Sequence, residues 1–118
     1  MSEKSTRISG SACRPYVQAR KPFHNSNKQL YAQWQTDDMY VVYSYGAHWP
    51  LLINWKGVWF ENEDKTSRTT TAHRGKTHPY KPTVLLSCYA MKRLVQSGEP
   101  SPEVMTLAAG LKLLGDAR

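Results

Sequence analysis

The chain contains 118 residues, of which 40% are hydrophobic and 21% are charged, and its formal net charge is +7. This length suits a single domain with its own core, and the composition is ordinary for a globular protein. No apolar run in the sequence approaches the roughly 18 residues that a membrane span needs. The sequence therefore excludes both a membrane-spanning helix and a largely disordered chain.

Two features of the sequence bear on the cellular compartment. Met1–Arg7 lack the apolar segment of a secretory signal, and Cys13 and Cys88 have neither metal-ligand nor redox-motif spacing. A single disulfide would be unusual in a protein without a leader. We therefore expect a cytoplasmic protein with two reduced thiols.

The positive charge is unevenly distributed along the chain. Residues 1–35 contain six Lys or Arg and one Glu, whereas residues 36–64 contain five acidic residues and only Lys56 as a base. Residues 65–93 contain seven Lys or Arg and no acidic residue. Two basic blocks therefore flank an acidic one, and a basic surface of this kind favours polyanions through counterion release.

Alternating apolar residues and short turns predict four strands in the first half of the chain. The first strand covers residues 29–35, and the second, residues 39–45, is rich in Val and Tyr and apolar on both faces. The third strand covers residues 49–55, and Lys56-Gly57 has the length of a hairpin loop before a short strand at residues 58–61. We expect an antiparallel β-meander of three to four strands at about residues 29–61.

Helical periodicity predicts two helices in the second half. They cover about residues 83–97 and 102–114, and Ser101-Pro102-Glu103 is a strong start signal for the second. Residues 61–81 are polar without a period and predict a long loop. The expected fold class is α+β, with both helices packed on one face of the meander. Residues 1–14 are expected to form a flexible basic arm and residues 15–118 a single α+β domain.

Histidines and carboxylates are the residues that could support catalysis or metal binding. His48 follows the second predicted strand, and His73 and His78 are five positions apart in the polar segment. This spacing lacks the tight pairs of structural zinc sites, and a cluster such as Glu61–Asp64 is more typical of a solvated strand end. No nucleophile, P-loop or dinucleotide motif occurs. We predict no metal, no cofactor and no catalytic residue, with a histidine-dependent hydrolase or metalloenzyme using His48 and His73 as an alternative.

The polar segment carries the strongest candidates for binding a partner. Cationic and hydroxyl groups recruit phosphates, and aromatic rings stack on bases. An acidic protein surface would suit the same side chains. The residues that we expect to contact a partner are His48, Asn62, Lys65, Arg68, His73, Arg74, Lys76, Tyr80 and Lys81.

A motif that runs from the second predicted strand into this segment resembles a family of short proteins encoded by bacteriophages and related mobile elements. The shared pattern is Tyr-Val-Val-Tyr-Ser-Tyr-Gly-x-His followed by Asn-x-Asp-Lys-x-Ser-x-Thr-Thr-x-x-His, and the family is described as a domain of unknown function. The similarity covers about residues 30–80. The matching positions are Tyr40–Gly46, His48, Asn62, Asp64, Lys65, Ser67, Thr69, Thr70 and His73.

The resemblance implies a small accessory protein of a phage or plasmid, present in the cytoplasm of the bacterial host. We therefore predict a non-enzymatic protein that binds and inhibits a host defence or nucleic-acid-processing complex, of the anti-CRISPR or anti-restriction type. Direct binding of DNA or RNA through residues 65–81 is the alternative. We expect no membrane partner, and a homodimer through a sheet edge is a further expectation.

Overall fold

A computed structural model describes residues 5–9, 12–25, 29–44, 49–64 and 68–110. Seven strands form one sheet, and their order in space equals their order in the chain. No helix in these ranges is long and apolar enough to cross a membrane. The strands are β1 (Thr6–Arg7), β2 (Phe23–His24), β3 (Leu30–Trp34), β4 (Met39–Ser44), β5 (Pro50–Trp55), β6 (Val58–Asn62) and β7 (Thr83–Leu86). The helices are α1 (Cys13–Gln18), α2 (Arg68–Thr77), α3 (Cys88–Ser97) and α4 (Pro102–Gly110).

The centre of the sheet is an antiparallel meander from β2 to β6. Every residue of β4 is buried, as the apolar character of both its faces predicted. The β5–β6 hairpin closes at Trp55 opposite Val58. Its two loop residues, Lys56 and Gly57, have φ values of 49° and 87°, which match a type I′ turn.

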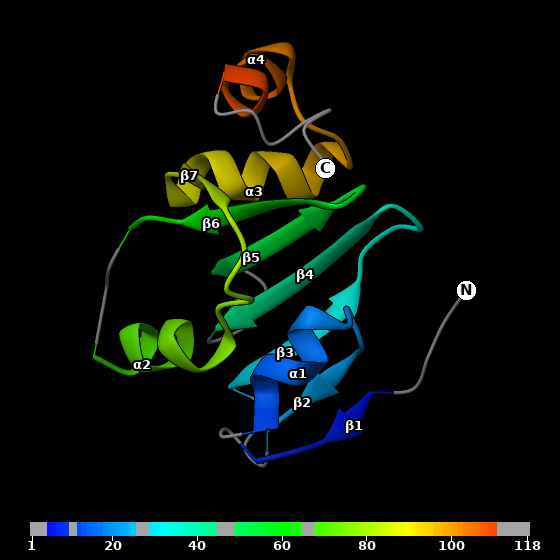
Figure 1. Ribbon diagram of the computed structural model, residues 1–118, viewed down its shortest axis with the longest axis vertical. Helices are drawn as coiled ribbons and strands as arrows, with labels where there is room; N and C mark the ends of the chain where they lie inside the picture. Colours follow the sequence, from blue (N-terminus) through cyan, green and yellow to red (C-terminus); the bar gives the residue numbers. More distant parts are fainter. Residues whose placement is uncertain (1–4, 10–11, 26–28, 45–48, 65–67, 111–118) are drawn as a thin grey trace.

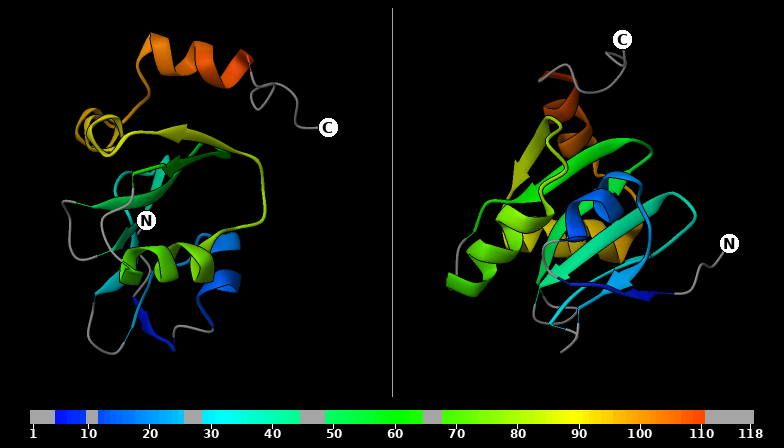
Figure 2. Two further views of the ribbon diagram at one scale, coloured as in Figure 1. Left: turned by 90° about the vertical axis from the view of Figure 1, so that its left-hand side faces the viewer. Right: turned by 60° about the horizontal axis from the view of Figure 1, so that its bottom comes forward.

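The expected fold, a three- to four-stranded meander covered only by two C-terminal helices, is wrong. Parallel strands extend the sheet at both edges, because α1 connects β1 to β2 and α2 connects β6 to β7. Each crossover leads to the next strand of the sheet in the same direction, and the strands that it joins have the same orientation in both cases. If both crossovers have the same handedness, α1 and α2 must lie on the same face of the sheet, as Figures 1 and 2 show.

The predicted start of the first C-terminal helix is also wrong. Residues 83–86 form β7 because Val84 and Leu86 alternate toward the core while Leu85 is 50% exposed. The helix α3 begins only at Cys88, after Ser87 accepts a hydrogen bond from the backbone N–H of Ala90. The short apolar run in this place is compatible with both the helical and the strand periodicity. The strand forms because β6 has an edge with which it can pair.

Each face of the sheet has its own hydrophobic core. On one face Met39, Val41 and Phe60 pack with residues of α3 and α4. On the other face Tyr40 and Val42 pack with Cys13 and Val17 of α1. In the side view of Figure 2 the sheet lies between these two helical layers. The first 14 residues, which were expected to form a flexible arm, contribute β1 and the start of α1 to the fold.

Candidate functional site

Helix α2 occupies residues 68–77 of the segment that was expected to be a loop. The two residues of α2 that the structure shows buried, His73 and Thr77, are polar and lie one turn apart. The Oγ1 of Thr77 donates to the carbonyl of His73 at 2.7 Å, and Nδ1 of His73 lies 2.8 Å from Oγ of Ser44 in β4. Polar contacts therefore dock this helix. The sequence lacked a signal for it, because no apolar stripe repeats every 3.6 residues.

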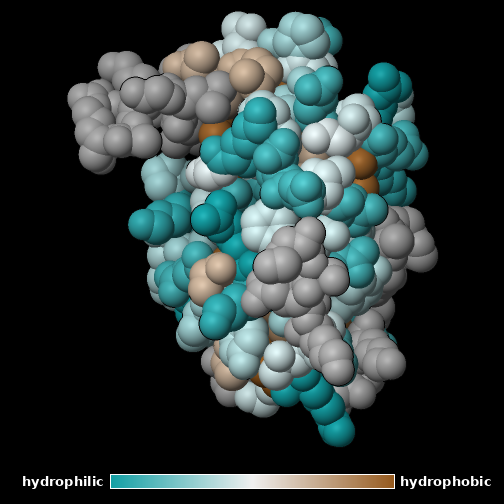
Figure 3. All heavy atoms as spheres, turned by 90° about the vertical axis from the view of Figure 1, so that its right-hand side faces the viewer, coloured by the Kyte–Doolittle hydropathy of each residue, from teal (hydrophilic) through white to brown (hydrophobic). Residues whose placement is uncertain are grey.

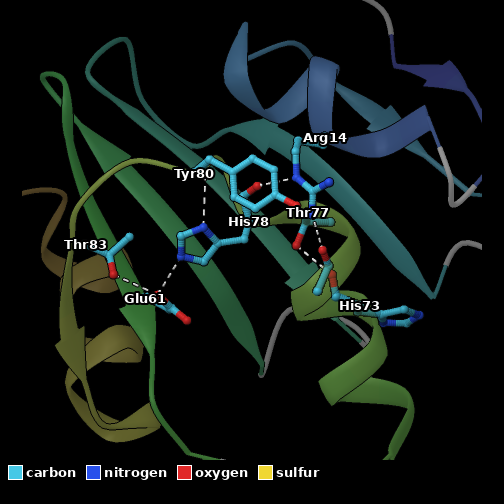
Figure 4. A network of polar contacts seen from close by, with 8 residues as sticks. Arg14, Glu61, His73, Thr77, His78, Tyr80 and Thr83 are labelled. Carbon is cyan, nitrogen blue, oxygen red and sulfur yellow. Dashed lines mark hydrogen bonds and ion pairs between the residues drawn. The ribbon is translucent and has the colours of Figure 1, made fainter.

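Arg14 of α1 links the two crossover helices. Its Nε donates to the carbonyl of His78 at 2.7 Å, and its terminal NH2 donates to the carbonyl of Gly75 in the last turn of α2 (Figure 4). Carbonyl groups at a helix C-terminus lack intrahelical partners and carry partial negative charge, so a guanidinium group satisfies both needs. The guanidinium carbon also lies 3.9 Å from the ring centroid of Tyr80. Arg14 therefore fixes both the end of α2 and the segment after it.

His78 is bonded at both ring nitrogens. Its Nδ1 accepts the backbone N–H of Tyr80 at 3.0 Å, which places the proton of the neutral ring on Nε2. That Nε2 lies 3.1 Å from Oε1 of Glu61 in β6, and Thr83 of β7 donates to the same oxygen at 2.7 Å. Figure 4 shows this chain of contacts from Thr83 to Tyr80. We call Arg14, Glu61, His78, Tyr80 and Thr83 the latch cluster.

The latch cluster adjoins exposed cationic residues. Lys76 on α2 and Lys81 next to Tyr80 are exposed, as are Arg20 and Lys21 after α1. The carboxylate of Glu61, by contrast, is buried and hydrogen-bonded. The opposite face mixes signs, because Lys92 and Arg93 of α3 lie close in the chain to Glu99 and Glu103. The α1–α2 face is therefore the more basic of the two.

Electrostatics at His73 agree with a structural role for its ring. Burial lowers the pKa of His73, and the nearby positive charge of Lys76 lowers it further. The residue is only 6% exposed. A neutral imidazole bonded to Ser44 holds α2 against the sheet, and a bulky substrate has no direct access to it.

The structure brings only part of the predicted partner-binding set together at the surface. Lys76, Tyr80 and Lys81 are exposed there, whereas His73 is buried on the side of α2 that faces β4. Asn62 is fully buried at the end of β6, where Nδ2 donates to the carbonyl of Pro50 at 2.9 Å and Oδ1 accepts the N–H of Asp64. The hydrogen bond to Pro50 thus joins the end of β6 to the start of β5. The remaining four predicted residues lie outside the described parts, His48 and Lys65 entirely and Arg68 and Arg74 in their side chains.

Arg14 and Gln18 are site residues that sequence reasoning missed. Gln18 Nε2 donates to the carbonyl of Pro79 at 3.0 Å, so both side chains reach across to the segment before β7. They lie more than 60 positions from their partners, and nothing in the local sequence distinguishes them from other polar residues of α1. Within the described ranges no group of three or more His, Cys, Asp or Glu is arranged to hold a metal ion.

No family model, no curated protein and no solved structure matches this chain. The similarity to phage-encoded proteins therefore remains a prediction from the motif. The function must be argued from the geometry of the molecule itself.

Proposed function

We propose that this protein is a non-enzymatic nucleic-acid-binding protein that uses the face formed by α1, α2 and the segment leading to β7. The observation that carries the proposal is the division of roles among polar groups on this face. Two histidines of this face are committed to internal hydrogen bonds, His73 with Ser44 and His78 with Glu61 and Tyr80. The exposed polar groups are mostly cations, which suit phosphate oxygens.

The side of the molecule that Figure 3 shows offers little support for a large apolar interface. Figure 3 shows that polar side chains cover most of one side of the molecule, where hydrophobic atoms form only small separate patches. Some of these patches lie at the top of the view, over α4. Charge is therefore the main property by which this protein could attract a partner over a distance.

The test is a titration of labelled DNA or RNA oligonucleotides at several salt concentrations, followed by fluorescence anisotropy. We expect the logarithm of the binding constant to fall linearly with the logarithm of salt concentration. Lys76→Ala should reduce the magnitude of this slope by about 0.7–0.9, the amount expected for one lost phosphate contact.

Lys92→Ala is the matched control, because Lys92 is also an exposed lysine, on a helix of the opposite face. Its slope should equal that of the unmodified protein. Binding that does not respond to salt, or an equal loss in both variants, would refute the assignment to the α1–α2 face.

A second proposal follows from the motif at Tyr40–His73. It is that the protein is a phage-type accessory factor which binds and inhibits a host defence or nucleic-acid-processing complex. The same basic face would serve there, because such complexes present phosphate or acidic surface. Affinity capture from host lysate, with and without nuclease treatment, distinguishes a direct protein partner from one that is held through nucleic acid.

A further inference from the structure

Tyr80 has a backbone conformation that a tyrosine rarely adopts. Its φ of 58° lies in the left-handed region, which glycine, asparagine and aspartate tolerate better than aromatic residues. Strain of this kind is commonly offset by burial of the side chain, yet Tyr80 is 69% exposed. The fold therefore keeps an aromatic ring at a strained position without using it in the core. Strained residues that the surrounding structure holds in place are typical of functional sites.

Several elements hold this conformation in place. The N–H of Tyr80 is bonded to Nδ1 of His78, whose ring is fixed in turn by Glu61 of β6. Gln18 of α1 holds the carbonyl of Pro79. Bonds from α1 and from β6 thus fix a segment of three residues, which lowers the entropic cost when a ligand binds to it.

Arg14 completes the arrangement by covering one side of the ring. Its guanidinium carbon lies 3.9 Å from the centroid, and its Nε is anchored 2.7 Å from the carbonyl of His78. A cation on the ring face is stabilised by the aromatic quadrupole and cannot swing away while it holds two carbonyl groups. A further cation is therefore a poor ligand for this site, and the remaining exposed ring surface suits a neutral planar group.

We infer that Tyr80 is a stacking platform for an unpaired base of single-stranded nucleic acid. This inference rests on the proposed function and specifies its substrate class. The bases of a duplex are already stacked and cannot lie on an external ring, whereas each base of a single strand presents a free π-face. Lys81 follows Tyr80 in the chain, Lys76 lies on the preceding helix, and both are exposed, so they are available to contact the phosphates of such a strand.

The experiment compares Tyr80→Asn with Tyr80→Phe. Asparagine tolerates the left-handed conformation and removes the ring, whereas phenylalanine keeps the ring and removes only the hydroxyl. Both variants and the unmodified protein are titrated by fluorescence anisotropy with a labelled single-stranded oligonucleotide of mixed sequence and with the duplex that it forms with its complement. Circular dichroism confirms that each variant is folded.

We expect the unmodified protein to bind the single strand more tightly than the duplex. Tyr80→Asn should weaken binding of the single strand by about five- to a hundredfold, as the loss of one stacked base predicts. The duplex should be bound almost unchanged, and Tyr80→Phe should retain the single-strand affinity.

Two results would overturn the inference while the proposed function stands. One is single-strand binding that does not change in Tyr80→Asn, and the other is an equal loss for single strand and duplex. Failure of the unmodified protein to bind either form would instead refute the proposed function, and the inference with it. In that case, a host protein that is still captured after nuclease treatment, and that is lost in Tyr80→Asn, would assign the ring to a protein interface.

Discussion

Replacing Arg14 by lysine should destabilise the protein measurably, although the charge is kept. Arg14 makes two hydrogen bonds to carbonyl groups and a cation–π contact with Tyr80, and it lies in a half-buried position. Lysine can reach one of these carbonyls but cannot reproduce the planar fork. The loss of one charge-assisted hydrogen bond, and of part of the ring contact, gives an expected cost of about 1–2 kcal/mol.

This cost converts into a thermal shift that is easy to measure. For a chain of 118 residues, an unfolding entropy of about 2.1 cal/mol/K per residue makes 1 kcal/mol equivalent to about 4 °C. Circular dichroism melting curves of Arg14→Lys should therefore show a midpoint about 4–8 °C below that of the unmodified protein. Urea titrations should give the same free-energy difference with an unchanged m-value.

Arg20→Lys is the matched control for this experiment. Arg20 follows the same helix, but its Nη1 lies 3.5 Å from Oδ1 of Asn54 and its guanidinium carbon 6.0 Å from the ring of Trp34, both at the limit of useful contact. We expect its midpoint to stay within about 2 °C of the unmodified value, as for a surface change of up to 0.5 kcal/mol. If both variants melt alike, or if Arg14→Lys melts like the unmodified protein, the role given to Arg14 is refuted.

Two further predictions concern His73 and Thr83. The pKa of His73 is below that of an unfolded histidine, about 6.5. The unfolded chain therefore binds the additional proton first, so stability should fall as pH drops below about 6.5, by at most about 1.4 kcal/mol per pH unit from this group. In His73→Gln this contribution should vanish, and equal pH slopes of unfolding free energy in both proteins would contradict the assignment. Thr83→Val removes the bond to Glu61 and should cost about 1 kcal/mol in urea unfolding. Thr106→Val, which removes an exposed helix bond, should cost less than 0.5 kcal/mol, and a reversed order of the two would refute the role of Thr83.

The central strands were predictable because their signals are local. Alternation of Met39, Val41 and Tyr43 against Tyr40 and Val42 places apolar side chains on both faces of β4, and the structure has both faces covered. Burial on both sides requires packed structure on each face of the sheet. The sequence pattern of this strand thus indicated cover on both faces, but the two predicted helices were expected on one face only, and nothing in the local sequence said which residues cover the other.

The candidate site was predictable only in outline. The polar segment was identified by composition, and the exposed Lys76, Tyr80 and Lys81 lie within it. The helical state of α2 depended on docking through His73 and Thr77. Neither residue has a local signal for burial, since histidine is intermediate in its tendency to be buried and threonine is more often exposed. Tertiary contacts therefore overrode a pattern that favoured a loop.

By itself the sequence determined the antiparallel strands between about residues 29 and 61, a two-residue hairpin loop at Lys56-Gly57 and a basic polar segment, because each follows from neighbouring residues. Only the tertiary structure decided that parallel strands extend both edges of the sheet and that α1 and α2 share a face. It also decided that Arg14 meets a segment 64 positions away and fixes Tyr80 there. The physical reason is that such pairings are selected by the global packing of the chain, in which an unpaired strand edge and unsatisfied helix carbonyls find their partners.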